Sequence, residues 1–89
     1  MDIPITSELR TICQEIEKKD LRESQWAEIE SDDMFQVGCF VGGYDADEHE
    51  FCFSYFSPNK GEYWFQFSLE VAKHISQGNN PVLSGRAAE

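Results

Sequence analysis

Among the side chains in this 89-residue sequence that could do chemistry, carboxylates are the most numerous. Between residues 23 and 59 the chain has no Lys or Arg and carries nine Asp or Glu residues. All seven basic residues lie outside that stretch, and the formal net charge is −10. Exposed carboxylates attract cationic surfaces, whereas nucleic acids and anionic membranes are bound by cationic ones. The composition therefore favours a basic protein as the partner and argues against nucleic acid or a membrane.

We expect these carboxylates to form one negative surface beside two exposed aromatic rings, which are common anchors in protein interfaces. The acids at 32–33 and at 45–50 are expected at opposite ends of one strand, about 25–30 Å apart, with residues 28 and 30 between them. The predicted partner-binding residues are Glu28, Glu30, Asp32, Asp33, Asp45, Asp47, Glu48, Glu50, Phe56 and Trp64.

A metal site is the first alternative use of the acids. Asp45, Asp47 and His49 are spaced like the start of a calcium-binding loop. An EF-hand needs Gly at the sixth position and Glu at the twelfth, where this chain has Glu50 and Phe56. The EF-hand interpretation fails. A looser divalent-ion site among the clustered acids is the remaining alternative, but the prediction is neither a metal nor another cofactor.

Thiol chemistry is the second alternative. Cys13, Cys39 and Cys52 show no C-x-x-C spacing, and together with His49 and His74 they match no zinc pattern. We predict free thiols in a reducing cytoplasm and no catalytic residue. The amino terminus lacks the pattern of a signal peptide, and no apolar run is long enough to cross a bilayer.

The elements that must position these residues begin with a helix over residues 7–19. Leu9, Ile12, Cys13 and Ile16 form one apolar stripe at helical spacing. Thr6 or Ser7 is expected to cap its first turn. A second helix is predicted over about residues 69–77, with Ser68 as its N-cap and Gly78 after its end.

The middle of the chain predicts an antiparallel sheet. Strands are expected over 25–30, anchored by Trp26, and over 34–41, where residues 35, 37, 39 and 41 would share one face. A loop over 42–47 is expected because a pair of glycines, here Gly42 and Gly43, commonly interrupts a strand. Further strands are expected over 50–57 and 62–68, joined by a turn at Pro58 and Gly61.

Aromatic alternation fixes the register of the last two strands. Pairing Phe56 with Glu62 aligns Tyr55 with Tyr63, Phe53 with Phe65 and Phe51 with Phe67. A slip by one residue would break all three pairs and bury Gln66. We therefore expect this aromatic face to pack on the first helix, and Phe56 and Trp64 to be exposed on the other face.

The predicted fold class is α+β: a three- to four-stranded antiparallel meander with an N-terminal and a C-terminal helix, in the order α-β-β-β-β-α. Residues 1–78 would form a single domain, and residues 79–89 a polar, flexible tail.

Two functions fit this sequence. In physical character it resembles immunity proteins, antitoxins and DNA-mimic inhibitors, although no family motif is present. That likeness implies a small cytoplasmic inhibitor that masks a basic, nucleic-acid-acting protein and is not an enzyme. The alternative is a small enzyme or ligand-binding domain with an aromatic-lined pocket, which lies either within one chain or at a dimer interface.

Overall fold

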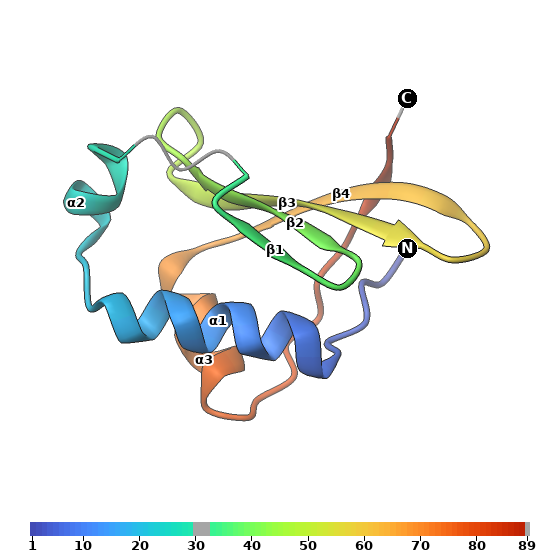
Figure 1. The fold of residues 1–89 in the computed structure, drawn as a ribbon, viewed down its shortest axis with the longest axis horizontal. Helices are drawn as coiled ribbons and strands as arrows, with labels where there is room; N and C mark the ends of the chain where they lie inside the picture. Colours follow the sequence, from blue (N-terminus) through green and yellow to red (C-terminus); the bar gives the residue numbers. More distant parts are fainter. Residues whose placement is uncertain (30–32, 89) are drawn as a thin grey trace.

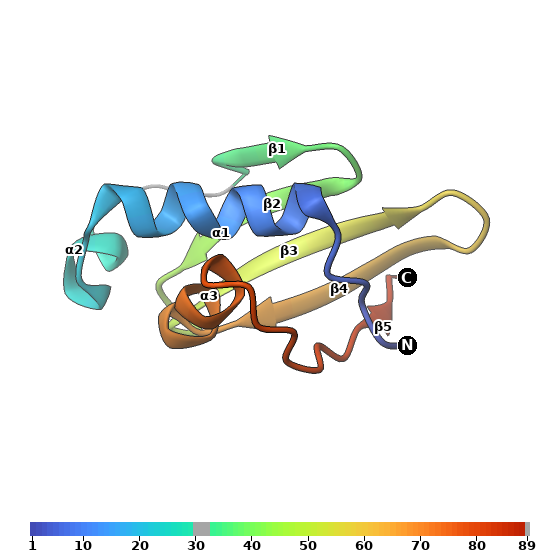
Figure 2. The ribbon, with the colours of Figure 1, turned by 90° about the horizontal axis from the view of Figure 1, so that it is seen from below.

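One antiparallel sheet with helices on a single face makes up the fold in the computed structural model, which describes residues 1–29 and 33–88. The sheet has five strands in the order β1-β2-β3-β4-β5. Helices α1 and α3 pack on one face, called here the inner face, and none of the described helices covers the opposite, outer face (Figures 1 and 2). The strands are β1 (Phe35–Val37), β2 (Phe40–Asp45), β3 (Glu50–Ser57), β4 (Gly61–Phe67) and β5 (Arg86–Ala87). The helices are α1 (Ser7–Lys19), α2 (Glu23–Ala27) and α3 (Leu69–Ser76).

The predicted α+β class with helices at both ends is confirmed. Helix α1 has the predicted bounds, and its stripe of Leu9, Ile12, Cys13 and Ile16 is buried. The Thr6 side chain accepts a hydrogen bond from the Leu9 N–H at 3.4 Å, as expected of an N-cap. Helix α3 is capped in the same way by Ser68.

The predicted register of β3 and β4 is also confirmed. Phe51 faces Phe67, Phe53 faces Phe65, and Tyr55 faces Tyr63. The four Phe rings continue into a core with the apolar side chains of α1 and α3, and the two Tyr rings are partly buried against that core. Because strand side chains alternate between faces, Cys52, Ser54, Trp64 and Gln66 lie on the outer face.

The strand predicted over 25–30 is wrong. Residues 23–27 form the short helix α2, in which Trp26 is fully buried and its neighbours are largely exposed. The Gln25 side chain accepts a hydrogen bond from the Arg22 N–H at 2.9 Å and so stabilises the first turn. One helical turn lets Trp26 reach Phe51, with ring centroids 5.1 Å apart, without any strand partner.

The single strand predicted over 34–41 is in fact a hairpin. Gly38 has φ of 58° and opens a two-residue turn, so that Val37 pairs with Phe40 and β2 runs on to Asp45. A left-handed glycine at the first central position is typical of a type II′ turn. The turn reverses the chain, and Val41 therefore lies on the outer face rather than beside Phe35.

The loop predicted over 42–47 is correct only after Asp45, because Gly42 is an interior strand residue. A Cβ at Gly42 would lie 2.2 Å from the Cys52 carbonyl oxygen and 2.7 Å from Phe53 Cγ. The missing side chain lets the Phe53 ring lie across Gly42 and stack near Phe35, with centroids 6.3 Å apart. Gly42 is needed because a neighbouring ring packs against its backbone. A sequence pattern does not distinguish such a glycine from one that ends a strand.

The segment over residues 80–88 packs against the domain, where the sequence suggested a tail. Leu83 is buried, and the Ile3 N–H donates to its carbonyl at 2.7 Å. Strand β5 then pairs with Tyr63 and Trp64 of β4. The polar composition of this segment hid one apolar anchor, so the folded unit extends beyond residue 78.

No helix within residues 1–29 and 33–88 has the length and apolar character needed to cross a membrane.

Candidate functional site

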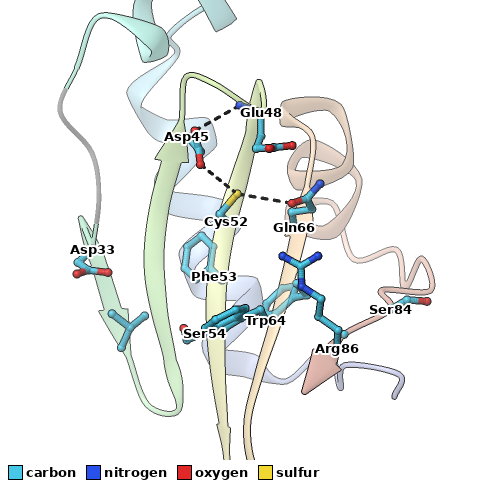
Figure 3. A pocket seen from close by; sticks show the side chains of 13 residues that line it. Asp33, Asp45, Glu48, Cys52, Phe53, Ser54, Trp64, Gln66, Ser84 and Arg86 are labelled. Atoms are coloured by element: carbon cyan, nitrogen blue, oxygen red, sulfur yellow. Dashed lines mark hydrogen bonds between the residues drawn. The ribbon is translucent and has the colours of Figure 1, made fainter. Parts of the chain in front are cut away.

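A groove of about 600 Å³ lies on the outer face of the sheet (Figure 3). Residues from β2, β3, β4 and β5 line it, together with Asp33 just before β1. The groove has an acidic end formed by Asp33, Asp45 and Glu48, and an aromatic part formed by Trp64. We call this hollow the outer groove.

The acidic end exists because the β1–β2 hairpin returns the chain. Phe35 pairs with Gly42, so the residues before β1 run beside the end of β2. The acids at 33 and at 45–48 therefore share one end of the sheet, and the predicted separation at opposite ends of a strand is wrong. The turn at Gly38, which the sequence did not predict, therefore places these acids closer together than expected.

Asp45 also shapes the β2–β3 turn. Its Oδ1 accepts hydrogen bonds from the N–H groups of Asp47, at 2.9 Å, and Glu48, at 3.3 Å. His49 completes the turn with φ of 58°, and its Nδ1 lies 3.7 Å from a Glu23 carboxylate oxygen. This contact between His49 and Glu23 is the only ion pair among the described residues. It involves none of the three acids at the acidic end.

The floor of the outer groove contains a thiol surrounded by acceptors. Cys52 Sγ lies 3.9 Å from Asp45 Oδ2 and 3.8 Å from Gln66 Oε1. Burial, and then the negative charges of Asp45, Glu48 and Glu50, raise the pKa of the Cys52 thiol to about 11. This thiol is therefore protonated at neutral pH and is a poor nucleophile.

The aromatic part of the outer groove pairs a ring with a cation. Trp64 is 40% exposed, and its indole N–H donates to Glu62 Oε2 at 2.9 Å. The Arg86 guanidinium carbon lies 5.8 Å from the centre of the Trp64 ring, within the range of a cation–π contact. In Figure 3 the Arg86 side chain extends from β5 over the groove towards Gln66.

The structure brings together only some of the predicted binding residues. Asp33, Asp45, Glu48 and Trp64 line the outer groove. Glu50 stands beside it and accepts a hydrogen bond from Gln66 Nε2 at 2.8 Å.

Three further predicted binding residues that the structure describes, Glu28, Asp47 and Phe56, do not line the groove. Phe56 is 46% exposed on the outer face, Glu28 is exposed at the end of α2, and Asp47 is exposed in the β2–β3 turn. Glu30 and Asp32 lie outside the described residues.

Sequence reasoning missed Arg86, Cys52 and Gln66 as residues of the groove. Arg86 was assigned to a tail, and the one signal against that assignment was the apolar Leu83 shortly before it. Cys52 and Gln66 could have been found, because the aromatic register already placed them on the same face as Trp64.

The described residues contain no cluster of three or more His, Cys, Asp or Glu side chains suited to hold a metal ion. Asp45, the first acid of the calcium-like spacing, uses one carboxylate oxygen to cap its own turn. The three cysteines carry free thiols, as predicted.

Comparison of the chain with protein-family models, with curated proteins and with solved structures returned no match.

Proposed function

We propose that the protein binds a basic protein partner through the outer groove and masks that partner's cationic site. The observation that carries this proposal is the meeting of Asp33, Asp45 and Glu48 at one end of a hollow that also exposes Trp64. Carboxylates without nearby cations remain free to pair with a partner's Lys and Arg residues. The net charge of −10 would steer such a partner towards the protein.

The proposed mode of action is inhibition by occupation. Carboxylates take the place of phosphate groups in the cationic site of a nucleic-acid-acting partner, and Trp64 supplies apolar contact area. Binding of this kind does not require catalysis by the inhibitor. The three free thiols support a reducing, cytoplasmic location.

The test compares two triple variants that remove equal charge. Asp33→Asn/Asp45→Asn/Glu48→Gln neutralises the acidic end. Asn suits position 33, where φ is 53°, and it preserves an acceptor oxygen at position 45. The control, Glu15→Gln/Asp20→Asn/Glu70→Gln, removes three exposed acids from the helical layer. Asp20 has φ of 51° and matches Asp33 in backbone conformation.

Affinity capture from the native cell extract should retain a basic protein on the wild type and on the control, but not on the acidic-end variant. The retained protein should be released at high salt, because screening weakens exposed charge pairs. With the captured protein purified, the acidic-end variant should bind at least about tenfold more weakly, mainly through slower association. Equal losses in both variants, or capture of only neutral and acidic proteins, would refute the proposal.

A small-molecule ligand is the second candidate, favoured by the volume of the outer groove. At about 600 Å³ it falls within the ordinary range of ligand pockets. An aromatic-lined pocket closed by a second copy of the chain would appear as a doubled mass in sedimentation. It would also make ligand-induced thermal stabilisation depend on protein concentration. A monomeric mass would exclude the dimer-interface form of this candidate.

A further inference from the structure

Arg86 occupies the outer groove in the way a partner's side chain would. Among the described residues that line the groove it is the one Lys or Arg, and its guanidinium lies over the exposed face of Trp64. At the acidic end, the lining carboxylates of Asp33, Asp45 and Glu48 form no ion pair with any residue that the structure describes. A cation from the chain itself thus covers the aromatic part of the candidate site.

We propose that the outer groove recognises an arginine side chain of the partner, and that Arg86 is a built-in competitor which this arginine displaces. This inference rests on the proposed function and specifies which group of the basic partner is bound. It also makes the C-terminal strand a regulator of affinity.

The lining fits a guanidinium better than an ammonium group. A guanidinium is planar and weakly hydrated, so it stacks on an indole ring and donates a fork of N–H groups to neighbouring acceptors. Trp64 supplies the ring. Gln66 supplies an oriented acceptor, because its Nε2 is bound to Glu50 and its Oε1 is directed towards Cys52. Asp45 and Glu48 lie beyond it at the acidic end (Figure 3).

Arg86 is attached so that it can leave without opening the core. Strand β5 has two residues, both exposed, which pair with Tyr63 and Trp64, and the Ala88 N–H that follows donates to the Glu62 carbonyl at 3.0 Å. The fixed point lies before it: the Gly85 N–H donates to the Met1 carbonyl at 2.7 Å, and Leu83 is buried. Movement after Gly85 would uncover Trp64 and leave these anchors in place.

The experiment uses two capped peptides of equal charge, one with three arginines and one with three lysines spaced by glycines, at low salt. Calorimetry gives the affinity, and the indole N–H signal of Trp64 in NMR spectra reports the site. Three proteins are compared: wild type, Arg86→Ala and Lys60→Ala. Lys60→Ala changes the net charge by the same amount as Arg86→Ala. Lys60 is exposed in the β3–β4 turn and does not line the groove, so its removal leaves the site unchanged.

We expect the arginine peptide to bind the wild type more tightly than the lysine peptide does and to shift the Trp64 indole signal. Arg86→Ala should bind the arginine peptide about two- to fivefold more tightly, the effect of removing one exposed cation–π competitor. Lys60→Ala should change affinity by less than about twofold, because its charge is distant and screened. Arg86→Gln, which keeps most of the side-chain stem, should behave as Arg86→Ala if the fold is intact by NMR.

The outcomes separate this inference from the proposed function. If both peptides bind at the groove but Arg86→Ala gains no more than Lys60→Ala, or binds more weakly, Arg86 is not a competitor and the basic-partner proposal stands. If the two peptides bind equally, recognition of arginine is refuted. If neither peptide binds any of the three proteins or shifts Trp64, the proposed function fails together with the inference.

Discussion

The two faces of β3 differ in what their side chains do. Phe51 and Phe53 on the inner face are almost fully buried among aromatic rings and helical side chains. Cys52 and Ser54, between and after them in sequence, line the open outer groove. Strand alternation thus lets one segment build the core and the candidate site at the same time. Substitutions on the inner face should change stability, and those on the outer face should change binding.

The strongest test of this comparison is Phe51→Ala. Phe51 is fully buried, 5.1 Å from the Trp26 ring and 5.6 Å from the Phe67 ring. Truncation should lower the free energy of unfolding by about 3–5 kcal/mol, measured by urea denaturation. The control on the other face of the same strand is Phe56→Ala, which should cost less than about 1 kcal/mol because that ring is 46% exposed. Similar losses in both variants would contradict the two-face description.

Gly42→Ala tests whether the inner face needs a missing side chain. The added methyl would collide with the backbone of β3, and we expect a loss of about 1–3 kcal/mol in the free energy of unfolding. Gly61→Ala is the control without a collision, since nothing lies within 4 Å of its Cβ position. Its φ of 88° still imposes backbone strain, so the two variants separate packing from conformation. A neutral Gly42→Ala would show that β2 and β3 are farther apart than described.

The thiols give the smallest predicted effect and probe the outer face directly. In a Cys39→Ser variant, iodoacetamide should modify Cys52 at pH 8 about tenfold more slowly than in the urea-unfolded chain. At pH 8, a thiol with a pKa of about 11 has a thiolate fraction roughly 100-fold lower than a thiol with a pKa of 9.0. The thiolate of the weaker acid is the stronger nucleophile, which offsets part of this difference in rate. The rate should keep rising with pH up to about 11. A plateau near pH 9 would contradict the described environment of Cys52.

Cys13 is the inner-face counterpart in that experiment. It is fully buried in α1, and burial raises the pKa of its thiol to about 12. It should react only when the protein unfolds, so its modification rate should rise steeply with urea concentration and should depend on pH as an unfolded thiol does.

The sequence predicted the parts of the fold that rest on periodic apolar residues. The bounds of α1 and the pairing of Phe51 with Phe67 follow from spacing alone, because each register error would bury polar groups. It failed where a single residue decides the path of the chain. Gly38 reverses the strand after Val37, and Gly42 remains inside one; the same residue type performs opposite tasks in different surroundings.

The candidate site was predicted in part for the same reason. Trp64 follows from strand alternation, and its exposure was expected. The meeting of Asp33 with Asp45 depends on the hairpin at Gly38, which was not predicted. Arg86 depends on the docking of a segment whose only apolar anchor is Leu83, a contact between distant parts of the chain that local patterns do not encode.

The order of the strands has a consequence for how the chain folds. From β1 to β4 every strand pairs with its successor, so most of the sheet can close through short loops with little entropic cost. The helical layer is different: the bond from Arg10 to the Ile75 carbonyl joins residues 65 positions apart. We expect the hairpins to be structured in the folding transition state and the α1–α3 contact to form later. In mutational phi-value analysis of the folding kinetics, substitutions at Ile12 should therefore give values near zero and substitutions at Phe53 high values.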